Sequence, residues 1–521
     1  MTSHAKSWLA PDSAAIATDQ QAQPAATGRR RFLTALGATG TACMLPLRSQ
    51  PALAATTTIS PTRPRPSPAQ LAWQREELAL FVHLGINTFT DREWGDGRES
   101  PTLFAPTQLD TRQWARAAKA AGFGSMILTA KHHDGFCLWP SATTQHSVAS
   151  SPWRDGQGDV LREFVDACRA EGLGTGVYLS PWDRNHPSYG HGQAYNDVYI
   201  AQLTELLTRY GPMIEVWFDG ANGEGANGKR QHYDWPRIHA TVRRLQPQAV
   251  IFSDAGPDVR WVGNEIGSAG ASNWSLVNPE RVPAPGANDP WTTEALQQGD
   301  PDGSLWRPAE TDVSIRPGWF WHAAQNKQVR GADNLLGLYF TSVGRNSKLL
   351  LNVPPNRDGL FDVPDLAALT GFHARKHALF AHDLMRGARV RASSGRDVQA
   401  LLDPDPDRHW QAEPGTRSAW LEFYLPAPVR FDVVALGEAI SHGQHIAAWR
   451  LQLHDGRDWR TLTWGSTLGY LRLARIRPHL AQRLRLLIDF AYDTPRIARI
   501  SLYHDPRTAE PSKRPDNHGD A

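Results

Sequence analysis

A single aspartate stands at the end of the most strand-like stretch of the chain. Residues 213–218 form an apolar, β-rich run, Asp219 follows it, and Gly220, Asn222 and Gly223 then break the pattern as a loop does. In a barrel of parallel strands, a polar residue at the C-terminal end of a strand faces the active site. We therefore predict that Asp219 is a catalytic carboxylate; an Asp that only caps the next turn is the structural alternative.

A second carboxylate would complete one chemistry that suits an Asp in this position. Hydrolysis of a glycosidic bond uses two carboxyl groups, one of which donates a proton and has a raised pKa. Glu265 is the best candidate, because Trp261 and Trp274 are near it in the sequence and would reduce its hydration and raise its pKa. Glu93 and Glu310 compete for the same role, and composition does not choose among the three.

Two adjacent histidines end another strand-like run. His132 and His133 would point to opposite faces of a continuing strand, but both can line one site where the strand turns into a loop. A metal site would need a third ligand, and no HExxH motif or Cys cluster supplies one. We therefore predict no metal and expect neutral imidazoles that donate hydrogen bonds to substrate hydroxyls. Histidines that only structure a loop are the alternative.

Strand and helix patterns alternate around these residues and must position them. Strands are expected at 78–89, 125–133, 174–182, 213–219 and 249–254, and helices at 109–121, 159–171, 195–210 and 235–245. Short connections between such units imply a parallel sheet. Each of the five strands ends in polar or aromatic residues, which favours a closed α/β barrel of the TIM type over an open sheet.

The second half of this barrel is irregular. Residues 256–316 are rich in Gly, Pro, Asn and Asp, which indicates long loops. Further elements are expected as a short strand at 318–322, a helix at 332–344, a last strand at 348–353 and a closing helix at 366–385. We therefore expect a distorted barrel.

The pattern changes from about Arg389 onward. Short alternating segments at 420–424, 431–436, 448–454, 484–490 and 497–504 are separated by Pro, Gly and Asp, as in an antiparallel β-sandwich. The expected organisation is a leader (1–54), a linker rich in Thr, Pro and Ser (55–69), a catalytic barrel (70–386), a β-sandwich (387–505) and a polar tail expected to be disordered (506–521).

The composition is typical of a globular protein with little net charge. The 521 residues are 40% hydrophobic and 21% charged, with a formal net charge of +2, so no strong field would attract nucleic acid or a membrane surface. Outside the leader, no stretch approaches the length of a membrane span. The 20 Trp residues suit stacking on sugar faces and core packing equally.

The N-terminal segment has the pattern of an export signal. Residues 29–33 (RRRFL) match a twin-arginine motif, a weakly apolar stretch follows, and residues 52–54 (ALA) fit a cleavage site. We therefore expect a mature protein that begins near Ala55 and resides in a bacterial periplasm or outside the cell. Cys137 and Cys168 would remain; they could form one disulfide, but their spacing does not require it.

Four motifs in order carry a family resemblance. They are residues 81–87 (FVHLGIN), 131–136 (KHHDGF), 216–220 (VWFDG) and 349–352 (LLLN). Together they resemble the α-L-fucosidases of glycoside hydrolase family 29, over about residues 70–385. The resemblance implies a distorted (β/α) barrel and a retaining mechanism in which Asp219 is the nucleophile. Retention needs a covalent glycosyl-enzyme and two carboxyl groups about 5–5.5 Å apart.

A finer resemblance concerns the linkage and the remaining site residues. Residues 260–267 (RWVGNEIG) and 306–320 resemble the branch that prefers α-1,3/1,4-linked fucose in branched, Lewis-type glycans, and in that branch Glu265 aligns with the acid/base. The implied fucose-binding positions are His83, Glu93, Trp94, His132, His133, Trp182 and Trp321. At the end of the third strand, either Trp182 or Asp183 could face the sugar.

The C-terminal domain carries a second resemblance. Residues 401–410 (LLDPDPDRHW) resemble discoidin-like modules, which implies galactoside binding or a structural calcium near Asp403, Asp405 and Asp407; Pro-rich turn chemistry explains these residues equally well. A domain that only supports the barrel is the alternative.

Three functional hypotheses follow from these resemblances. The leading one is a retaining exo-α-L-fucosidase that needs no metal or organic cofactor and acts on fucosylated oligosaccharides. A broader fucosidase that also cleaves α-1,2 links and a catalytically silent fucose-binding protein are the alternatives. The presence of both Asp219 and Glu265 argues against the silent protein, because binding alone needs neither carboxyl.

Overall fold

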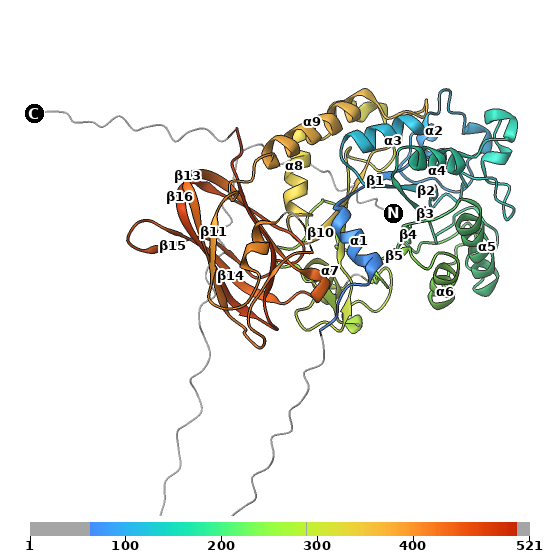
Figure 1. The fold of residues 1–521 in the computed structure, drawn as a ribbon. Coiled ribbons are helices and arrows are strands. Elements are labelled where there is room, and N and C mark those ends of the chain that lie inside the picture. Colours follow the sequence, from blue (N-terminus) through green and yellow to red (C-terminus); the bar gives the residue numbers. More distant parts are fainter. Residues whose placement is uncertain (1–62, 288, 404, 406, 508–521) are drawn as a thin grey trace, which may run out of the picture. The chain divides into compact units, whose positions relative to one another are not determined.

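Eight parallel strands close into a barrel (Figure 1). The structure is a computed structural model and describes residues 63–507 except 288, 404 and 406. The barrel strands are β1 (Leu78–Val82), β2 (Ser125–Lys131), β3 (Gly174–Leu179), β4 (Glu215–Trp217), β5 (Val250–Ser253), β6 (Val259–Trp261), β9 (Ala309–Ser314) and β10 (Ser347–Asn352). They neighbour one another in the order β1-β10-β9-β6-β5-β4-β3-β2. The expected TIM-like barrel is confirmed.

Helices follow most of these strands. They are α1 (Pro68–Glu76), α2 (Ile86–Thr90), α3 (Thr111–Ala120), α4 (Val160–Ala170), α5 (Gln193–Arg209), α6 (Trp235–Leu245), α7 (Pro290–Gln298), α8 (Ala332–Thr341) and α9 (Val363–Phe380). Asp110, Asp159 and Asp234 begin α3, α4 and α6, and each side chain accepts a backbone N–H from the first turn. The local sequence therefore fixes where these helices start.

Two expected strands differ from the structure. The strand expected at 78–89 stops at Val82, and α2 occupies its second half. The strand expected at 318–322 is wrong, because β9 provides the barrel strand in this region. β9 has a weak hydrophobic pattern, since Glu310 and Asp312 are carboxyls buried within the barrel.

Aromatic side chains fill the barrel interior. Trp217 stacks on Phe252 with ring centres 4.0 Å apart, and Phe81 and Tyr178 pack against Trp217. A packed interior leaves the mouth at the C-terminal strand ends as the place where a substrate can be reached.

A seven-stranded antiparallel sheet follows the barrel in the chain (Figure 1). Its strands are β11 (Arg389–Ala392), β12 (Trp410–Gln411), β13 (Ala419–Glu438), β14 (Ile446–His454), β15 (Trp459–Gly465), β16 (Arg472–Ala491) and β17 (Arg496–Tyr503). The long strands β13 and β16 shift register where they pair, which lets the sheet bend around its own core. This architecture matches the expected β-sandwich. A separate small ribbon joins β7 (Leu276–Val277) to β8 (Leu305–Trp306).

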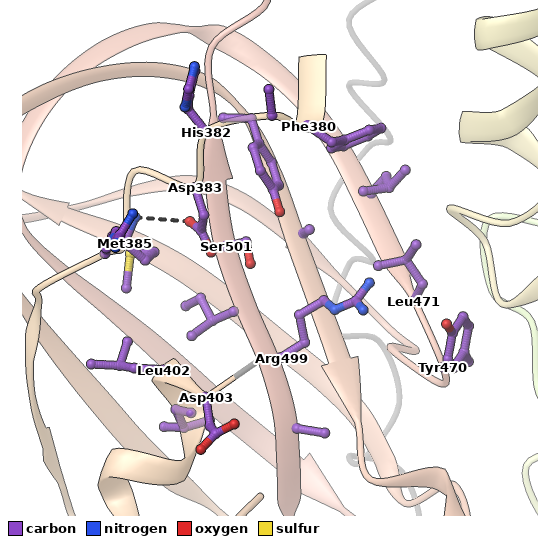
Figure 2. Close-up of a pocket in the computed structure, with 18 of the residues that line it drawn as sticks. Phe380, His382, Asp383, Met385, Leu402, Asp403, Tyr470, Leu471, Arg499 and Ser501 are labelled. Carbon is purple, nitrogen blue, oxygen red and sulfur yellow. Dashed lines mark hydrogen bonds between the residues drawn. The ribbon is translucent and has the colours of Figure 1, made fainter. Parts of the chain in front are cut away.

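Buried polar groups connect the barrel region to the sheet domain. Gln444 Oε1 accepts the N–H of Ser275, and Gln444 Nε2 donates to the carbonyl of Asn273. A cavity of about 760 Å³ lies beside this boundary; its lining includes Arg499 and Asp383, which accepts the N–H of Met385 (Figure 2). None of the predicted active-site residues lines this cavity.

The first described helix and the two cysteines can be compared with the expected organisation. α1 begins at Pro68, inside the expected linker, with Ser67 as a capping residue. The expected leader and nearly all of the expected tail lie outside the described residues. Cys137 and Cys168 are buried free thiols. No helix in the described part of the chain is long and apolar enough to span a membrane.

Candidate active site

Asp219 lies at the mouth of the barrel, two residues after β4. Its Oδ2 accepts the hydroxyl of Tyr178 at 3.0 Å, and its Oδ1 accepts the backbone N–H of Ala221 at 2.7 Å. The side chain keeps 26% of its surface exposed. Asp219 is therefore a carboxylate held from two sides that a ligand in the mouth can reach.

Glu265 lies on the loop that follows β6 and is exposed at the mouth. Its Oε2 accepts the indole N–H of Trp319 at 3.4 Å. Poor hydration of the carboxyl group raises the pKa of Glu265, and the negative charges of Asp219 and Glu93 raise it further, while the Trp319 N–H acts in the opposite direction. These effects shift the protonation equilibrium of Glu265 toward the acid form.

Two further carboxyls, which the sequence analysis did not assign to the site, line the same mouth. Asp254 directly follows β5, its Oδ2 accepts the N–H of Gly286 at 2.8 Å, and burial followed by the charge of Asp219 raises its pKa to about 6. Asp312 lies on β9, and burial followed by the charge of Glu265 raises its pKa well above the ordinary value. Asp254 was detectable as the end of a predicted strand, whereas β9 was not predicted.

Hydrogen bonds fix the ring orientation of His133. Its Nδ1 lies 2.8 Å from the hydroxyl of Ser180, which itself donates to the carbonyl of Trp182. Because the single hydroxyl hydrogen is used in this way, His133 Nδ1 is the donor to Ser180. His133 Nε2 then faces the mouth, 3.8 Å from Asp219 Oδ2.

A hydrogen bond also fixes the ring orientation of His83. Asn352 directs its amide nitrogen to the carbonyl of Trp319 at 2.8 Å, so its Oδ1 faces His83 Nδ1 at 2.8 Å and accepts its hydrogen. His132 packs between the two other histidines, with ring centres 5.6 Å from His83 and 4.1 Å from His133. The three predicted histidines therefore form one cluster.

All three imidazoles favour the neutral form. Burial lowers the pKa of His83 to about 3, and burial followed by the two neighbouring histidines lowers that of His132 well below its ordinary value. Burial also lowers the pKa of His133, although the charge of Asp219 opposes this change. Neutral His83 and His133 use their N–H within the protein, so they offer Nε2 as an acceptor rather than the donor that we expected.

Glu93 connects its own loop to the loop after β9 through hydrogen bonds, beside the histidine cluster. Its Oε2 accepts the backbone N–H of Trp319 at 3.0 Å, and its Oε1 accepts His322 Nε2 at 3.3 Å. A Cβ on Gly318 would lie 1.8 Å from Glu93 Oε1, so only glycine permits this approach. Burial raises the pKa of Glu93, and the two backbone N–H groups oppose it.

Trp319 and Phe320 bring aromatic rings beside the histidines. The ring centre of Trp319 lies 5.1 Å from that of His83, and its indole reaches Glu265. Trp321 instead donates its indole N–H to Asp362 at 3.1 Å. Fucose binding by Trp321 stays a prediction.

The other two predicted tryptophans lie at the opposite side of the histidine cluster. The ring of Trp182 lies 4.9 Å from His133, and that of Trp94 lies 5.8 Å from His133 and 5.9 Å from Trp182. Trp94 is 57% exposed, so its ring is open to solvent, and its contact with a sugar stays a prediction.

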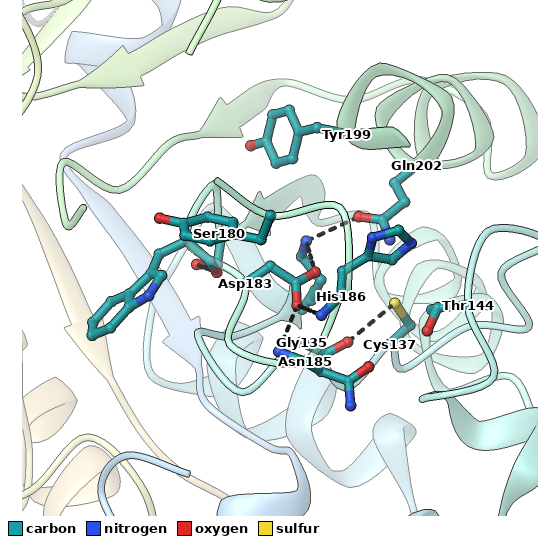
Figure 3. Close-up of polar contacts among 12 residues, drawn as sticks. Gly135, Cys137, Thr144, Ser180, Asp183, Asn185, His186, Tyr199 and Gln202 are labelled. Atoms are coloured by element: carbon teal, nitrogen blue, oxygen red, sulfur yellow. Dashed lines mark hydrogen bonds and ion pairs between the residues drawn. The ribbon is translucent and has the colours of Figure 1, made fainter. Parts of the chain in front are cut away.

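Asp183 is a structural residue and does not face the mouth. It is buried, pairs with Lys131 Nζ at 2.9 Å, and accepts the backbone N–H groups of Asn185 and His186 (Figure 3). Burial would raise the pKa of Asp183, but the Lys131 ammonium and these hydrogen bonds outweigh it and hold the pKa below its ordinary value. Of the two alternatives, Trp182 therefore faces the site.

Two other sequence interpretations are corrected by the structure. Glu310, a competitor for the acid/base role, is fully buried and accepts the indole N–H of Trp217 at 3.0 Å inside the barrel. Trp274, expected to reduce the hydration of Glu265, packs with Trp306 and Ile440 in a separate cluster at the sheet domain. Trp319 takes its place beside Glu265.

The three aspartates of the C-terminal loop bind one another's backbone and nearby arginines. Asp403 accepts the N–H of Asp405 and pairs with Arg408, and Asp407 pairs with Arg75. Within the described residues, no group of three or more His, Cys, Asp or Glu is arranged to hold a metal ion. Calcium or galactoside binding by this domain stays a prediction.

Comparisons with known proteins agree with this geometry. A family model described as Alpha-L-fucosidase matches residues 73–372. The Arabidopsis thaliana protein named Alpha-L-fucosidase 1 is 45% identical and covers 85% of this chain and 88% of its own, and a rice relative is 47% identical over similar shares, 85% and 86%. A Ruminococcus gnavus GH29 fucosidase in complex with fucose is 32% identical, with a TM-score of 0.77 over 85% of this chain and 95% of its own.

The comparisons overturn the expected localisation. We expected a bacterial protein with a twin-arginine signal, in the periplasm or outside the cell. The two relatives that match most of the chain at 45–47% identity are plant proteins from Arabidopsis and rice (Oryza sativa subsp. japonica). Residues 29–33, which suggested the signal, lie outside the described residues. The bacterial export prediction is therefore wrong.

Proposed function

Because this chain belongs to the α-L-fucosidases of glycoside hydrolase family 29, we propose that it releases terminal fucose with retention of configuration, through a covalent fucosyl-Asp219 intermediate. The chain is a glycoside hydrolase of the α-L-fucosidase type. Its catalytic mechanism and its linkage preference are the parts that we propose.

One observation carries the mechanism. Asp219 and Glu265 lie at one mouth, and the charge of Asp219 contributes to the raised pKa of Glu265. A nucleophile must be ionised and a general acid must be protonated, so two interacting carboxyls of this kind suit the two roles. The alternative of a silent fucose-binding protein gives no reason for this arrangement.

In the first step, Asp219 attacks the anomeric carbon while Glu265 protonates the glycosidic oxygen. The Tyr178 hydroxyl and the Ala221 N–H would hold the carboxylate in the attacking orientation. The step forms the ester bond to Asp219 and breaks the glycosidic bond, and the leaving group takes the proton of Glu265.

In the second step, the Glu265 carboxylate accepts a proton from water. The water oxygen attacks the anomeric carbon, the ester bond breaks, and Asp219 is restored as a carboxylate. The released fucose has the α configuration of the substrate, because two inversions have occurred.

The sugar would be held by the neutral histidines, Glu93 and the aromatic rings. His83 and His133 would accept hydroxyl hydrogens at Nε2, and Trp319 supplies an apolar face suited to one side of fucose and its methyl group. The complex of the Ruminococcus gnavus relative with fucose supports fucose as the ligand of this chain.

We infer a preference for α-1,3/1,4-linked fucose in branched glycans from the segments around Glu265 and Trp319. The test follows fucose release from a Lewis-type trisaccharide and from 2′-fucosyllactose by proton NMR. Release from the branched sugar alone supports the preference. Equal release from both supports the broader fucosidase, and release from neither supports the silent binding protein.

A further inference from the structure

Asp312 is a buried carboxyl of the mouth to which the mechanism above gives no role. It lies on β9, its side chain is 4% exposed, and its Oδ1 accepts the indole N–H of Trp261 at 2.7 Å. Trp261 is the last residue of β6, and the loop that leaves β6 carries Glu265. The hydrogen bond therefore fixes the end of the strand from which the Glu265 loop departs.

The strands β6 and β9 pair only briefly at this point. Arg260 pairs with Ala309 and Trp261 with Glu310, and β6 is three residues long. One further backbone hydrogen bond, from the N–H of Val262 to the carbonyl of Glu310 at 3.0 Å, supports the end of β6. A side-chain hydrogen bond from Trp261 to the next inward residue of β9 extends the connection toward the mouth.

We propose that Asp312 is a positioning residue for the acid/base Glu265, because its carboxyl oxygen anchors Trp261 at the start of the Glu265 loop. This inference rests on the proposed role of Glu265. Asp312 acts through Trp261. A protonated Asp312 keeps one carboxyl oxygen without a hydrogen, and this oxygen is enough to accept the indole N–H of Trp261.

Burial is the larger reason why the pKa of Asp312 is raised, and neighbouring carboxylates raise it further. Asp219 is the charge that acts on both Asp312 and Glu265 while Glu265 is protonated; an ionised Glu265 would act on Asp312 as well, and Glu93 acts on Glu265. The remaining titratable groups of the mouth are Asp254 and the neutral His83, His132 and His133. An ionised Asp312 would add a negative charge to a buried position next to other carboxylates.

A neutral Asp312 also suits both steps of the reaction. Before the first step, Asp219 carries the charge and Glu265 is protonated. After it, Asp219 is an uncharged ester and Glu265 carries the charge. The trio of Asp219, Glu265 and Asp312 therefore holds one negative charge throughout, and a charged Asp312 would repel the Glu265 carboxylate in the second step.

Two substitutions test whether Asp312 acts as a neutral hydrogen-bond acceptor or as a charged group. Asp312→Asn keeps an oxygen acceptor for Trp261 and is neutral at every pH, so kcat should stay within about threefold of the wild type and the alkaline limb of kcat/KM should not move. Asp312→Leu has a similar size and no acceptor, so kcat should fall by about tenfold or more with little change in KM. Thermal unfolding of both variants checks that they are folded.

A double substitution tests whether Asp312 acts through Trp261. Trp261→Phe removes the indole N–H, so its loss of kcat should resemble that of Asp312→Leu, and the two changes together should cost no more than either alone. Additive losses would contradict the proposed route. A downward move of the alkaline limb by about one pH unit in Asp312→Asn would show that Asp312 is ionised in the wild type and would overturn its proposed neutral state.

Infrared difference spectra provide a readout that does not need turnover. The spectrum of the wild type minus that of Asp312→Asn at neutral pH should contain the C=O stretch of a protonated carboxyl; a carboxylate band in its place would overturn the proposed neutral state of Asp312. If the wild type fails to hydrolyse any fucoside, the proposed function fails while this measurement still decides the protonation of Asp312. If the wild type is active and Asp312→Leu equals it, only the inference fails.

Discussion

The hydroxyl of Tyr178, on β3, donates a hydrogen bond of 3.0 Å to Asp219 Oδ2, two residues after β4. Tyr178 is buried and its ring packs against Phe81 and Trp217 inside the barrel. The packed interior therefore sets the position of the hydroxyl, and the hydroxyl sets the orientation of the carboxylate. The barrel core and the chemistry at its mouth are linked through this one contact.

Removal of this hydroxyl should weaken catalysis more than stability. A hydrogen bond to a charged group contributes about 1.5–3 kcal/mol, so we expect Tyr178→Phe to lower kcat by roughly tenfold to a hundredfold. The control is Tyr210→Phe, which removes a similar hydroxyl-to-carboxylate bond, of 2.9 Å to Asp159, away from the mouth. Equal activity of the two variants on an aryl fucoside would contradict the role of Tyr178.

Azide should distinguish the two catalytic carboxyls. Asp219→Gly leaves space at the position of the nucleophile, so azide can attack the substrate directly and give a β-fucosyl azide. Glu265→Ala still forms the ester from an activated aryl fucoside, and azide then attacks that ester and gives an α-fucosyl azide. NMR of the products checks both results, and the same anomer from both variants would refute the separate roles.

The indole of Trp319 should affect the pH dependence. Its N–H stabilises the Glu265 carboxylate and opposes the rise of the Glu265 pKa. Trp319→Phe removes this donor, so the pKa of Glu265 should rise and the alkaline limb of kcat/KM should move to higher pH by roughly half a unit. A limb that moves to lower pH would show that Trp319 acts mainly by excluding water. Trp321→Phe is the matched control and should leave the limb in place.

The buried ion pair behind the site should contribute to stability. Lys131 and Asp183 are both buried, so Lys131→Met leaves a carboxylate without its cation and should reduce the free energy of unfolding by about 3–5 kcal/mol at neutral pH. Arg450→Met breaks an exposed pair with Asp489 and should have little effect.

The loss of unfolding free energy in Lys131→Met should become smaller as the pH falls. The folded protein holds the pKa of Asp183 below its ordinary value, so the contribution is present above the pKa of an unfolded Asp and is lost as pH falls through the lower, folded value. The difference between Lys131→Met and the wild type should therefore shrink in acid. Chemical unfolding at several pH values checks this, and a difference that grows in acid would contradict the assignment.

Much of the barrel was predictable because its strands follow simple patterns. The strands β2, β3, β4 and β5 are apolar runs that end in polar or aromatic residues, and the nearby helices α3, α4 and α6 have clear caps. β9 was missed because Glu310 and Asp312 interrupt its apolar pattern. A strand that carries buried carboxyls for a site has a weak hydrophobic signal for that same reason.

The site was predictable at the level of motifs and less so at the level of single contacts. The histidine motif and Asp219 lie together as the resemblance implied. The aromatic neighbour of Glu265 depends on how the loop after β9 turns, which explains why Trp319 and not Trp321 is beside it. Long-range contacts of this kind leave no spacing pattern in the sequence.

The stereochemistry of the first product tests the central claim most directly. Proton NMR should follow the hydrolysis of an aryl α-L-fucoside from the first minutes, before the released sugar equilibrates between its anomers. The two-step mechanism with Asp219 and Glu265 predicts that α-fucose appears first and that β-fucose grows only by slow mutarotation. If β-fucose appears first, a single inverting displacement operates, and neither the fucosyl-Asp219 intermediate nor the role of Glu265 can stand.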